Sequence, residues 1–263
     1  MTFSIVATAD DQWGVAVASK FLAVGAAVPA ARHGVGAVAT QSYANLAYRP
    51  EGLRLMAEGG TAQSALDALT AADELREQRQ AGLVDAAGRA ATWTGSACHP
   101  WAGGRTGDGW AAQGNILTGP EVVDALAGTF KSSEGSLAQR LAAALLAGDR
   151  AGGDRRGRQS AVLLVVSKDG GYGGGSDVLV DLRVDDHPDP VAELQRLLEL
   201  HHLYFGTPEE TLPLEGDLLV EVSNRLEALG YKDLEDWAGV ENYEERMVPG
   251  AIDVLVLEKL RQA

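Results

Sequence analysis

The sequence predicts an α+β fold, a four-layer α-β-β-α sandwich in which two antiparallel sheets stack face to face, followed by a small helical C-terminal domain. Short β-type runs come in pairs joined by connections of hairpin length. Pairs of helical segments follow groups of such runs twice along the chain. The connections between runs are too short for the crossovers of a parallel sheet, so antiparallel sheets with outer helix pairs satisfy the pattern.

The first half of the chain has β-type runs at residues 2–8, 13–20 and 34–41, and helical segments at residues 49–60 and 61–73. The polar stretch ADDQ between the first two runs predicts an antiparallel hairpin. Pro50 near the start of the first helical segment and Gly59 near its end are typical helix boundaries.

The second half repeats this order, with β-type runs at residues 79–88, 89–95 and 109–117, and helical segments at residues 119–130 and 136–148. Two further runs follow at residues 160–167 and 177–184. The Gly-rich segment between them is a flexible hairpin connection by composition. A helix with Pro190 in its first turn is expected over residues 187–202.

The length of 263 residues suits one main domain with a small appendage. The composition changes near residue 204, and the part from there onward contains 14 Asp and Glu residues against 5 Lys and Arg residues. We therefore expect a main domain over residues 2–203 and a small, acidic, mostly helical domain over residues 204–263.

The composition excludes several classes of function. A formal net charge of −15 argues against a nucleic-acid partner or an anionic membrane surface, because either would need a basic face. No apolar run approaches the roughly 20 residues that span a bilayer, and the N-terminus lacks the features of a signal peptide. Cys98 is the single cysteine, and the His residues are scattered. We expect a cytoplasmic protein with no metal and no other cofactor.

Thr2 is the sharpest candidate for chemistry. Methionine aminopeptidase removes Met1 efficiently when the second residue is small, which would leave Thr2 with both a hydroxyl and a free α-amine. The reference pKa of such an amine is about 7.7–8.0, so an unprotonated fraction exists near neutral pH and can take the hydroxyl proton. The alternative is that Thr2 simply begins a strand.

A nucleophile of this kind needs positive charge to lower the pKa of the amine, and donors to hold an oxyanion. Lys20 ends the second β-type run, and Asn115 lies in an otherwise apolar run, where it either donates to an oxyanion or bonds neighbouring backbone. The remaining candidates, for substrate binding, are Arg32, Gln41, Asn45, Gln113, Asp154, Arg155, Arg156, Arg158 and Ser160. The three arginines of the loop at residues 152–160 either bind a carboxylate or set a pKa, unless the loop is merely solvated.

Several segments together resemble a known family. They are MTFSIVA, GVAVASKFLAVGAAVP, GVGAVATQSYAN, CHPWAGG, AAQGNIL, GGDRRGRQSA and LVDLRVDDHPDPV. In this order, over roughly residues 2–200, the chain resembles the bacterial domain of unknown function 1028 (DUF1028), which is placed in the N-terminal nucleophile (Ntn) hydrolase superfamily. The resemblance implies the four-layer fold of proteasome β-subunits, with Thr2 in the place of the nucleophile.

The chain differs from the Ntn enzymes at two charged positions, and its C-terminal part resembles a second family. Proteasome-type Ntn enzymes keep an acid at the end of the second strand and a Lys on the third, where this chain has Lys20 and Arg32. Residues 206–263 resemble a peptidoglycan-binding module that is found C-terminal to the domain of this family. The acidity of this part favours a subunit contact or a lid over docking on an anionic wall polymer.

We therefore expect an amidohydrolase in which Thr2 attacks a small amide or peptide bond, with Met1 removal as the only activation step. The arginine loop and Lys20 would favour a carboxylate-bearing substrate. The alternative is a non-catalytic oligomeric scaffold or ligand-binding protein on the same fold, whose C-terminal unit binds a partner or a cell-wall fragment. A homo-oligomer, dimeric or larger, is expected.

Overall fold

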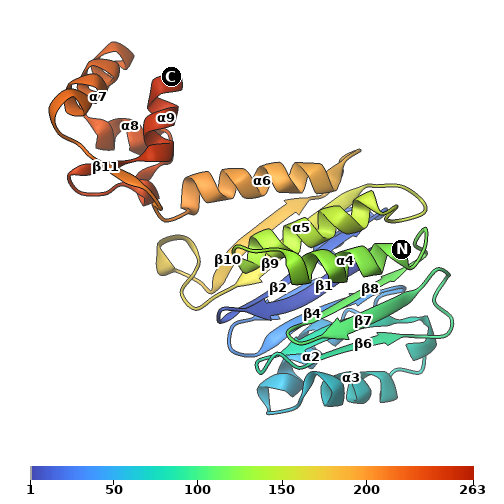
Figure 1. Ribbon diagram of the computed structural model, residues 1–263. Coiled ribbons are helices and arrows are strands. Elements are labelled where there is room, and N and C mark those ends of the chain that lie inside the picture. The colour runs from blue at the N-terminus through green and yellow to red at the C-terminus, as the bar shows by residue number, and fades with distance from the viewer. Residues whose placement is uncertain (1) are drawn as a thin grey trace. The chain divides into compact units, whose positions relative to one another are not determined.

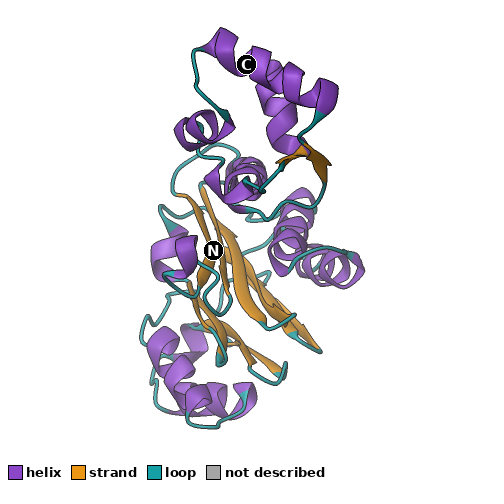
Figure 2. Ribbon diagram, turned by 90° about the vertical axis from the view of Figure 1, so that its left-hand side faces the viewer, coloured by secondary structure: helices purple, strands orange, loops and turns teal. Residues whose placement is uncertain are grey.

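The computed structural model describes residues 2–263, which form a mixed α+β fold with antiparallel sheets, as expected (Figures 1 and 2). The chain divides into two compact units, one ending at Arg196 and one running from Leu197 to Ala263. This division lies inside helix α6 (Pro190–Phe205), ahead of the 203/204 boundary expected from composition. The composition changes only after the helix, whereas Leu203 and Tyr204 already pack on the C-terminal core.

The larger sheet has six strands in the order β10-β9-β2-β1-β8-β7. Its strands are β1 (Thr2–Ala9), β2 (Gln12–Ser19), β7 (Gly103–Gly107), β8 (Trp110–Asn115), β9 (Ser160–Val166) and β10 (Val178–Val184). The predicted hairpin of β1 and β2 is confirmed. On its other side β1 pairs with β8, and Thr2 lies opposite Asn115 in this register. The first residue of the strand therefore lies between two neighbours inside the sheet.

The smaller sheet has the order β3 (Pro29–Arg32), β4 (Gly36–Gln41), β5 (Gln80–Asp85) and β6 (Ala90–Thr94). Small apolar side chains of the two sheets form one buried cluster, which includes Val6, Val15 and Val17 of the larger sheet and Ala37, Ala39 and Val84 of the smaller. Successive side chains of a strand point to opposite faces of the sheet, so residues two apart, such as Val15 and Val17, share the face that meets the other sheet.

Helix pairs lie on the outer faces of both sheets (Figure 1). The helices α4 (Glu121–Ser132) and α5 (Leu137–Arg150) pack on the larger sheet, and α2 (Tyr48–Ala57) and α3 (Ala62–Ala71) on the smaller. Capping boxes at Thr61 and Ser136 begin α3 and α5 at the predicted positions. Short helices lie between these elements: α1 (Val24–Ala27) and the 3-10 turns η1 (Arg76–Gln78) and η2 (Tyr172–Gly174).

Among the elements that the sequence analysis did not predict are α1, β3 and β7. The first two are only four residues long. The third, GGRTG, is a partly exposed edge strand rich in glycine, so it lacks the apolar alternation that predicts a strand. The third predicted run also begins later than expected, at Gly36, because Gly34 has a φ of 69° and belongs to the preceding turn.

The C-terminal unit has its own apolar core, in which Trp237 and Tyr243 are buried. Its elements are β11 (Thr211–Pro213), α7 (Gly216–Leu229), α8 (Leu234–Val240), η3 (Glu244–Arg246), β12 (Ala251–Asp253) and α9 (Val254–Gln262). Arg246 and Asp253 form an ion pair of 2.6 Å, and their side chains are 1% and 2% exposed. None of the helices within residues 2–263 combines the length and apolarity needed to cross a bilayer.

Candidate active site

A pocket of about 570 Å³ opens at the N-terminal end of β1, and we refer to it as the Thr2 pocket. Its polar lining includes Thr2, Gln41, Ser42, His99, Asn115 and Arg156. These residues come from both sheets and from the loops that follow β4, β6 and α5. The pocket therefore forms where strand ends of the two sheets meet.

Thr2 is almost fully buried, at 5% exposure, in the floor of this pocket. The distance between its Oγ1 atom and the Oγ atom of Ser19 is 3.1 Å. Its backbone carbonyl accepts a hydrogen bond of 3.3 Å from the side-chain amide of Gln41. Met1, whose removal is predicted, lies outside the described residues. The sequence analysis missed Ser19, although the hairpin register alone places it beside Thr2.

Four buried amide side chains, Gln41, Gln80, Gln113 and Asn115, lie between the sheets, and we call them the amide cluster. The Oε1 atom of Gln80 accepts hydrogen bonds from Gln41 Nε2 at 2.8 Å and from Asn115 Nδ2 at 2.9 Å. Its Nε2 atom donates to the carbonyl of Gly114 at 2.7 Å. Every such bond crosses from one strand to another, so the cluster fixes the floor of the Thr2 pocket.

Within the described residues, the side chain of Asn115 is tied to the amide cluster through its Nδ2 atom. A side-chain amide has two N–H groups, and the bond to Gln80 uses one of them. The sequence analysis missed Gln80 itself. The signal was present, because Gln80 is a polar residue at the head of an apolar run, as Gln113 is a polar residue within one.

Gln113 completes the cluster through Ser4. Its Nε2 atom donates to Ser4 Oγ at 2.7 Å, and Ser4 Oγ donates to Gln41 Oε1 at 2.8 Å. A Cβ atom at Gly82 would lie 2.0 Å from Gln113 Oε1, so only glycine at position 82 leaves room for this amide. The facing strand is thus shaped around Gln113.

The arginine loop reaches the Thr2 pocket through Arg156. The buried carboxylate of Asp154 accepts hydrogen bonds from the backbone N–H groups of Lys20 and Arg156, both at 2.8 Å. It also pairs with the Arg156 guanidinium at 3.1 Å. Lys20 therefore contributes a backbone N–H group to this arrangement, while its side chain is exposed and does not line the pocket.

The other predicted site residues are not brought to the Thr2 pocket. Arg32 and Arg155 have exposed side chains at the end of β3 and in the loop after α5. Arg158 pairs with Asp149 at 2.8 Å, and this hydrogen bond raises the pKa of Arg158. Ser160 is buried, and its hydroxyl donates to the carbonyl of Phe21. Ser160 therefore stabilises the loop after β2 without lining the Thr2 pocket.

The loop after β4 forms one side of the pocket in an uncommon backbone conformation. Ser42 and Tyr43 have φ values of 60° and 50°, and Ile116, after β8, has 48°. Such values are rare outside glycine, above all for a β-branched residue, and they cluster at functional sites. The Tyr43 hydroxyl lies 3.2 Å from Nε2 of His99, so the two loops that carry these residues meet beside the pocket.

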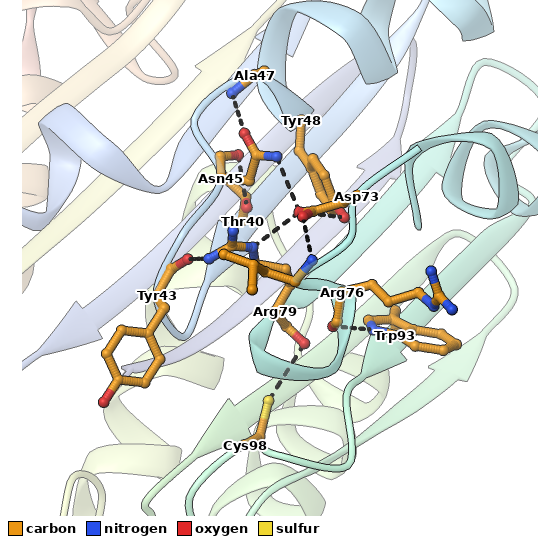
Figure 3. Close-up of polar contacts among 11 residues, drawn as sticks. Thr40, Tyr43, Asn45, Ala47, Tyr48, Asp73, Arg76, Arg79, Trp93 and Cys98 are labelled. Carbon is orange, nitrogen blue, oxygen red and sulfur yellow. Dashed lines mark hydrogen bonds and ion pairs between the residues drawn. The ribbon is translucent and has the colours of Figure 1, made fainter. Parts of the chain in front are cut away.

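An ionic cluster under this loop, shown in Figure 3, consists of Asn45, Tyr48, Asp73 and Arg79, and we call it the Asp73 cluster. The Asp73 carboxylate accepts hydrogen bonds from Asn45 Nδ2 at 3.0 Å, Tyr48 Oη at 3.1 Å and Arg79 Nε at 2.9 Å. The guanidinium of Arg79 also donates to the carbonyl of Tyr43. The predicted substrate-binding residue Asn45 thus serves the loop and does not line the pocket.

The electrostatics of the Asp73 cluster follow from these contacts. Burial acts to raise the pKa of Asp73, but the hydrogen bonds from Arg79 and Asn45 outweigh it and hold the pKa well below its usual range. Burial and the neighbouring carboxylate raise the pKa of Tyr48 well above its usual value. Asp73 is therefore an anion and Tyr48 a neutral donor at neutral pH.

Arg79 also holds the second loop of the pocket. Its backbone carbonyl accepts hydrogen bonds from the Gly95 N–H group at 3.0 Å and from the Cys98 thiol at 3.3 Å. Burial raises the pKa of this thiol, which favours a structural role. Within residues 2–263, no group of three or more His, Cys, Asp or Glu side chains is placed to hold a metal ion.

Comparisons with known proteins cover both units. The model of a family described as "Family of unknown function (DUF1028)" matches residues 2–194, and one described as "Putative peptidoglycan binding domain" matches residues 204–260. The crystal structure of protein SPO2555 from Silicibacter pomeroyi, to which the DUF1028 model is also assigned, is 29% identical, with a TM-score of 0.69. The match covers 84% of this chain and 92% of that chain. No curated protein matches the chain.

Proposed function

The chain belongs to the DUF1028 family, whose function is unknown, and from the geometry of the Thr2 pocket we propose that it is an amidohydrolase with Thr2 as its nucleophile. The bond cleaved is a small amide or peptide bond. The observation that carries the proposal is the place of Thr2, with its hydroxyl in the floor of a pocket of about 570 Å³ at the head of a central strand. Removal of Met1 adds the α-amine that the chemistry needs.

The reaction proceeds in two halves. The Thr2 hydroxyl attacks the substrate carbonyl while the α-amine of Thr2 accepts the hydroxyl proton. The second N–H group of Asn115 donates to the oxyanion of the tetrahedral intermediate. The amine then protonates the leaving nitrogen, which leaves an ester on Thr2, and water hydrolyses this ester with the same amine as base. The reaction written in this way uses no cofactor.

The surroundings of Thr2 support these roles. Ser19 Oγ, at 3.1 Å, orients the nucleophile, and the carboxamide of Gln41 fixes the backbone of Thr2. Arg156 lines the pocket, so we give it the role expected of Lys20, which is to lower the pKa of the amine. We further propose that the order of helices and sheets is that of the Ntn hydrolases, whose nucleophile begins the first strand.

The proposal is tested by an intact-mass spectrum of protein from its native host, before and after incubation with a peptide epoxyketone. This reagent needs both a hydroxyl and a free α-amine to form its ring adduct. We expect a mass without Met1 and an adduct mapped to Thr2, and no adduct on a Thr2→Val variant, which keeps the shape but lacks the hydroxyl. A native protein that retains Met1 would rule the mechanism out.

A second candidate function concerns the C-terminal unit, because of its match to a peptidoglycan-binding model. This unit holds a pocket of about 810 Å³ between α7 and residues 247–251, which would take a cell-wall fragment. Co-sedimentation of the protein with insoluble peptidoglycan, and not with chitin, tests this function. We also propose a cytoplasmic homo-oligomer, which cell fractionation and light scattering would test.

A further inference from the structure

We propose that the Thr2 pocket selects substrates with an apolar acyl group of about leucine size or larger beside the scissile carbonyl, and this rests on the proposed function. The polar groups that the proposed reaction uses lie in the floor of the pocket. Thr2, Gln41 and Asn115 are at most 5% exposed, and the last two are held by Gln80. A reacting carbonyl lies over these groups, so the rest of the acyl group must meet the walls.

Apolar side chains form much of the walls and rim of the pocket, beside the polar residues Ser42, His99 and Arg156. The buried residues Val24, in α1, and Val28, directly after it, line the pocket, and so does Ile116. Phe21 and Leu46 also line the pocket and remain 53% and 49% exposed, which places them at its mouth. Exposing this apolar surface to water costs free energy. An apolar ligand that covers the surface recovers that free energy on binding. A volume of about 570 Å³ lies within the range of ligand pockets.

The charges near Thr2 disfavour an acidic acyl group. In the described part of the chain, Arg156 is the only Lys or Arg that lines the pocket, and its guanidinium is paired with Asp154 at 3.1 Å. A substrate carboxylate would have to share that guanidinium with a buried aspartate, and the two anions repel. Arg155 and Arg158, the other members of the loop, lie outside the pocket. We therefore expect the arginine loop to favour carboxylate-bearing substrates much less than the sequence alone predicted.

The backbone conformation of Ile116 also supports the selection of an apolar acyl group. A β-branched residue at a φ of 48° is held there by its surroundings, with its N–H group donating to the His99 carbonyl at 2.9 Å. This conformation keeps an isoleucine side chain in the pocket wall directly after Asn115. An apolar side chain therefore stands next to the candidate oxyanion donor.

The test compares epoxyketones that differ only in the residue beside the reactive ketone, which is leucine, glycine or glutamate. The rate of adduct formation on Thr2 is followed by mass spectrometry. We expect the leucine reagent to react at least about 10-fold faster than the other two, as apolar pockets discriminate by such factors. Equal rates for leucine and glutamate, with the adduct still on Thr2, would overturn the selectivity and leave the proposed function intact.

Two variants locate the selectivity within the pocket. Leu46→Gln places a polar group at the mouth and should lower the leucine-to-glutamate ratio. Leu22→Gln is the matched control, because Leu22 is 60% exposed and does not line the pocket, so its ratio should equal that of the unaltered protein. A ratio that falls equally in both variants would contradict the assignment of the wall.

A binding measurement separates the selectivity from the reaction. Thr2→Val protein is titrated with acetyl-leucine amide and with acetyl-glutamate amide, and binding is followed by NMR. Tighter binding of the leucine amide supports the inference even if no epoxyketone reacts, in which case the proposed nucleophile alone fails. Equal or tighter binding of the glutamate amide overturns the inference.

Discussion

At the scale of single residues, each side chain in the floor of the site is held by a partner on another strand. Thr2 has its partners Ser19 and Asn115 on the two neighbouring strands, because the register of the sheet places them there. Gln80 receives two amide donors at once, although it does not line the Thr2 pocket. We therefore expect a change at Gln80 to lower the free energy of unfolding before it alters the chemistry of the pocket.

Replacing Gln80 with leucine should lower the free energy of unfolding by about 2–4 kcal/mol. The variant leaves buried N–H groups of Gln41 and Asn115 without their acceptor, and each such group costs about 1–3 kcal/mol. Urea denaturation followed by tryptophan fluorescence measures the change. Gln63→Leu, on the exposed face of α3, is the control and should change stability by less than about 0.5 kcal/mol. Equal effects would show that the amide cluster is not stabilising.

At the scale of elements, the pocket is assembled by loops that a partly buried ion pair holds. Arg79 binds the carbonyl of Tyr43 through its side chain and the thiol of Cys98 through its carbonyl, so it joins the loop after β4 to the loop after β6 (Figure 3). Asp73 fixes Arg79 in turn, at 2.9 Å. The shape of the pocket therefore depends on a carboxylate that does not line it.

Replacing Asp73 with asparagine should loosen both loops. Hydrogen exchange at neutral pH should rise in residues 42–46 and 95–99, and the free energy of unfolding should fall by about 1–3 kcal/mol, since Arg79 loses its anion. Asp67→Asn, on the exposed face of α3, should leave both quantities unchanged. Unaltered exchange in the Asp73 variant would contradict this role.

The same variant has a predicted pH dependence. Because the pKa of Asp73 is depressed in the folded state, its contribution to stability is complete above the unfolded pKa of about 3.9 and is lost as pH falls through the lower folded pKa. The unaltered protein should therefore lose more stability than the Asp73→Asn variant when the pH is lowered below about 4.

At the scale of the whole molecule, the two units have separate apolar cores. The buried ion pair of the C-terminal unit connects several of its elements, because Arg246 also donates to the carbonyls of His202 and Leu203 while Asp253 caps α9. An uncompensated charge at this place would be costly for the C-terminal unit.

Replacing Asp253 with alanine should destabilise the C-terminal unit by about 3–5 kcal/mol, the usual cost of leaving a buried charge without its partner. Hydrogen exchange should rise across residues 216–262 and stay unchanged in the amide cluster. Asp253→Asn, which keeps a cap on α9, should show most of the effect. Lys232→Ala removes a pair whose lysine is 87% exposed and should have almost none. Equal exchange in all three variants would refute the argument.

Local patterns predicted the regular elements of this molecule well and its site only in part. Short β-type runs bounded by turn residues identified β1, β2 and β9, and the helical segments expected from residues 61 and 136 begin at the capping residues Thr61 and Ser136. The edge strand β7 escaped because its sequence, GGRTG, lacks apolar residues, although it forms a hairpin with the neighbouring strand β8.

Site prediction from sequence met a different obstacle. A pattern shows at which strand end a polar residue lies, but not which partner it meets in space. Asn45 and Arg158 were expected at the site, yet each has an aspartate partner elsewhere. Ser19 looked like an ordinary strand residue, and it lies beside Thr2.

The amide cluster has a consequence for how this sequence can evolve. A change at Gln41, Gln80, Gln113 or Asn115 leaves a partner on another strand unsatisfied, and a change at Gly82 displaces Gln113. These positions cannot drift one at a time without a loss of fitness at the intermediate step. Lineages that replace one of them should carry a compensating replacement at another, so the five positions should be inherited as a block even where the surrounding strands diverge.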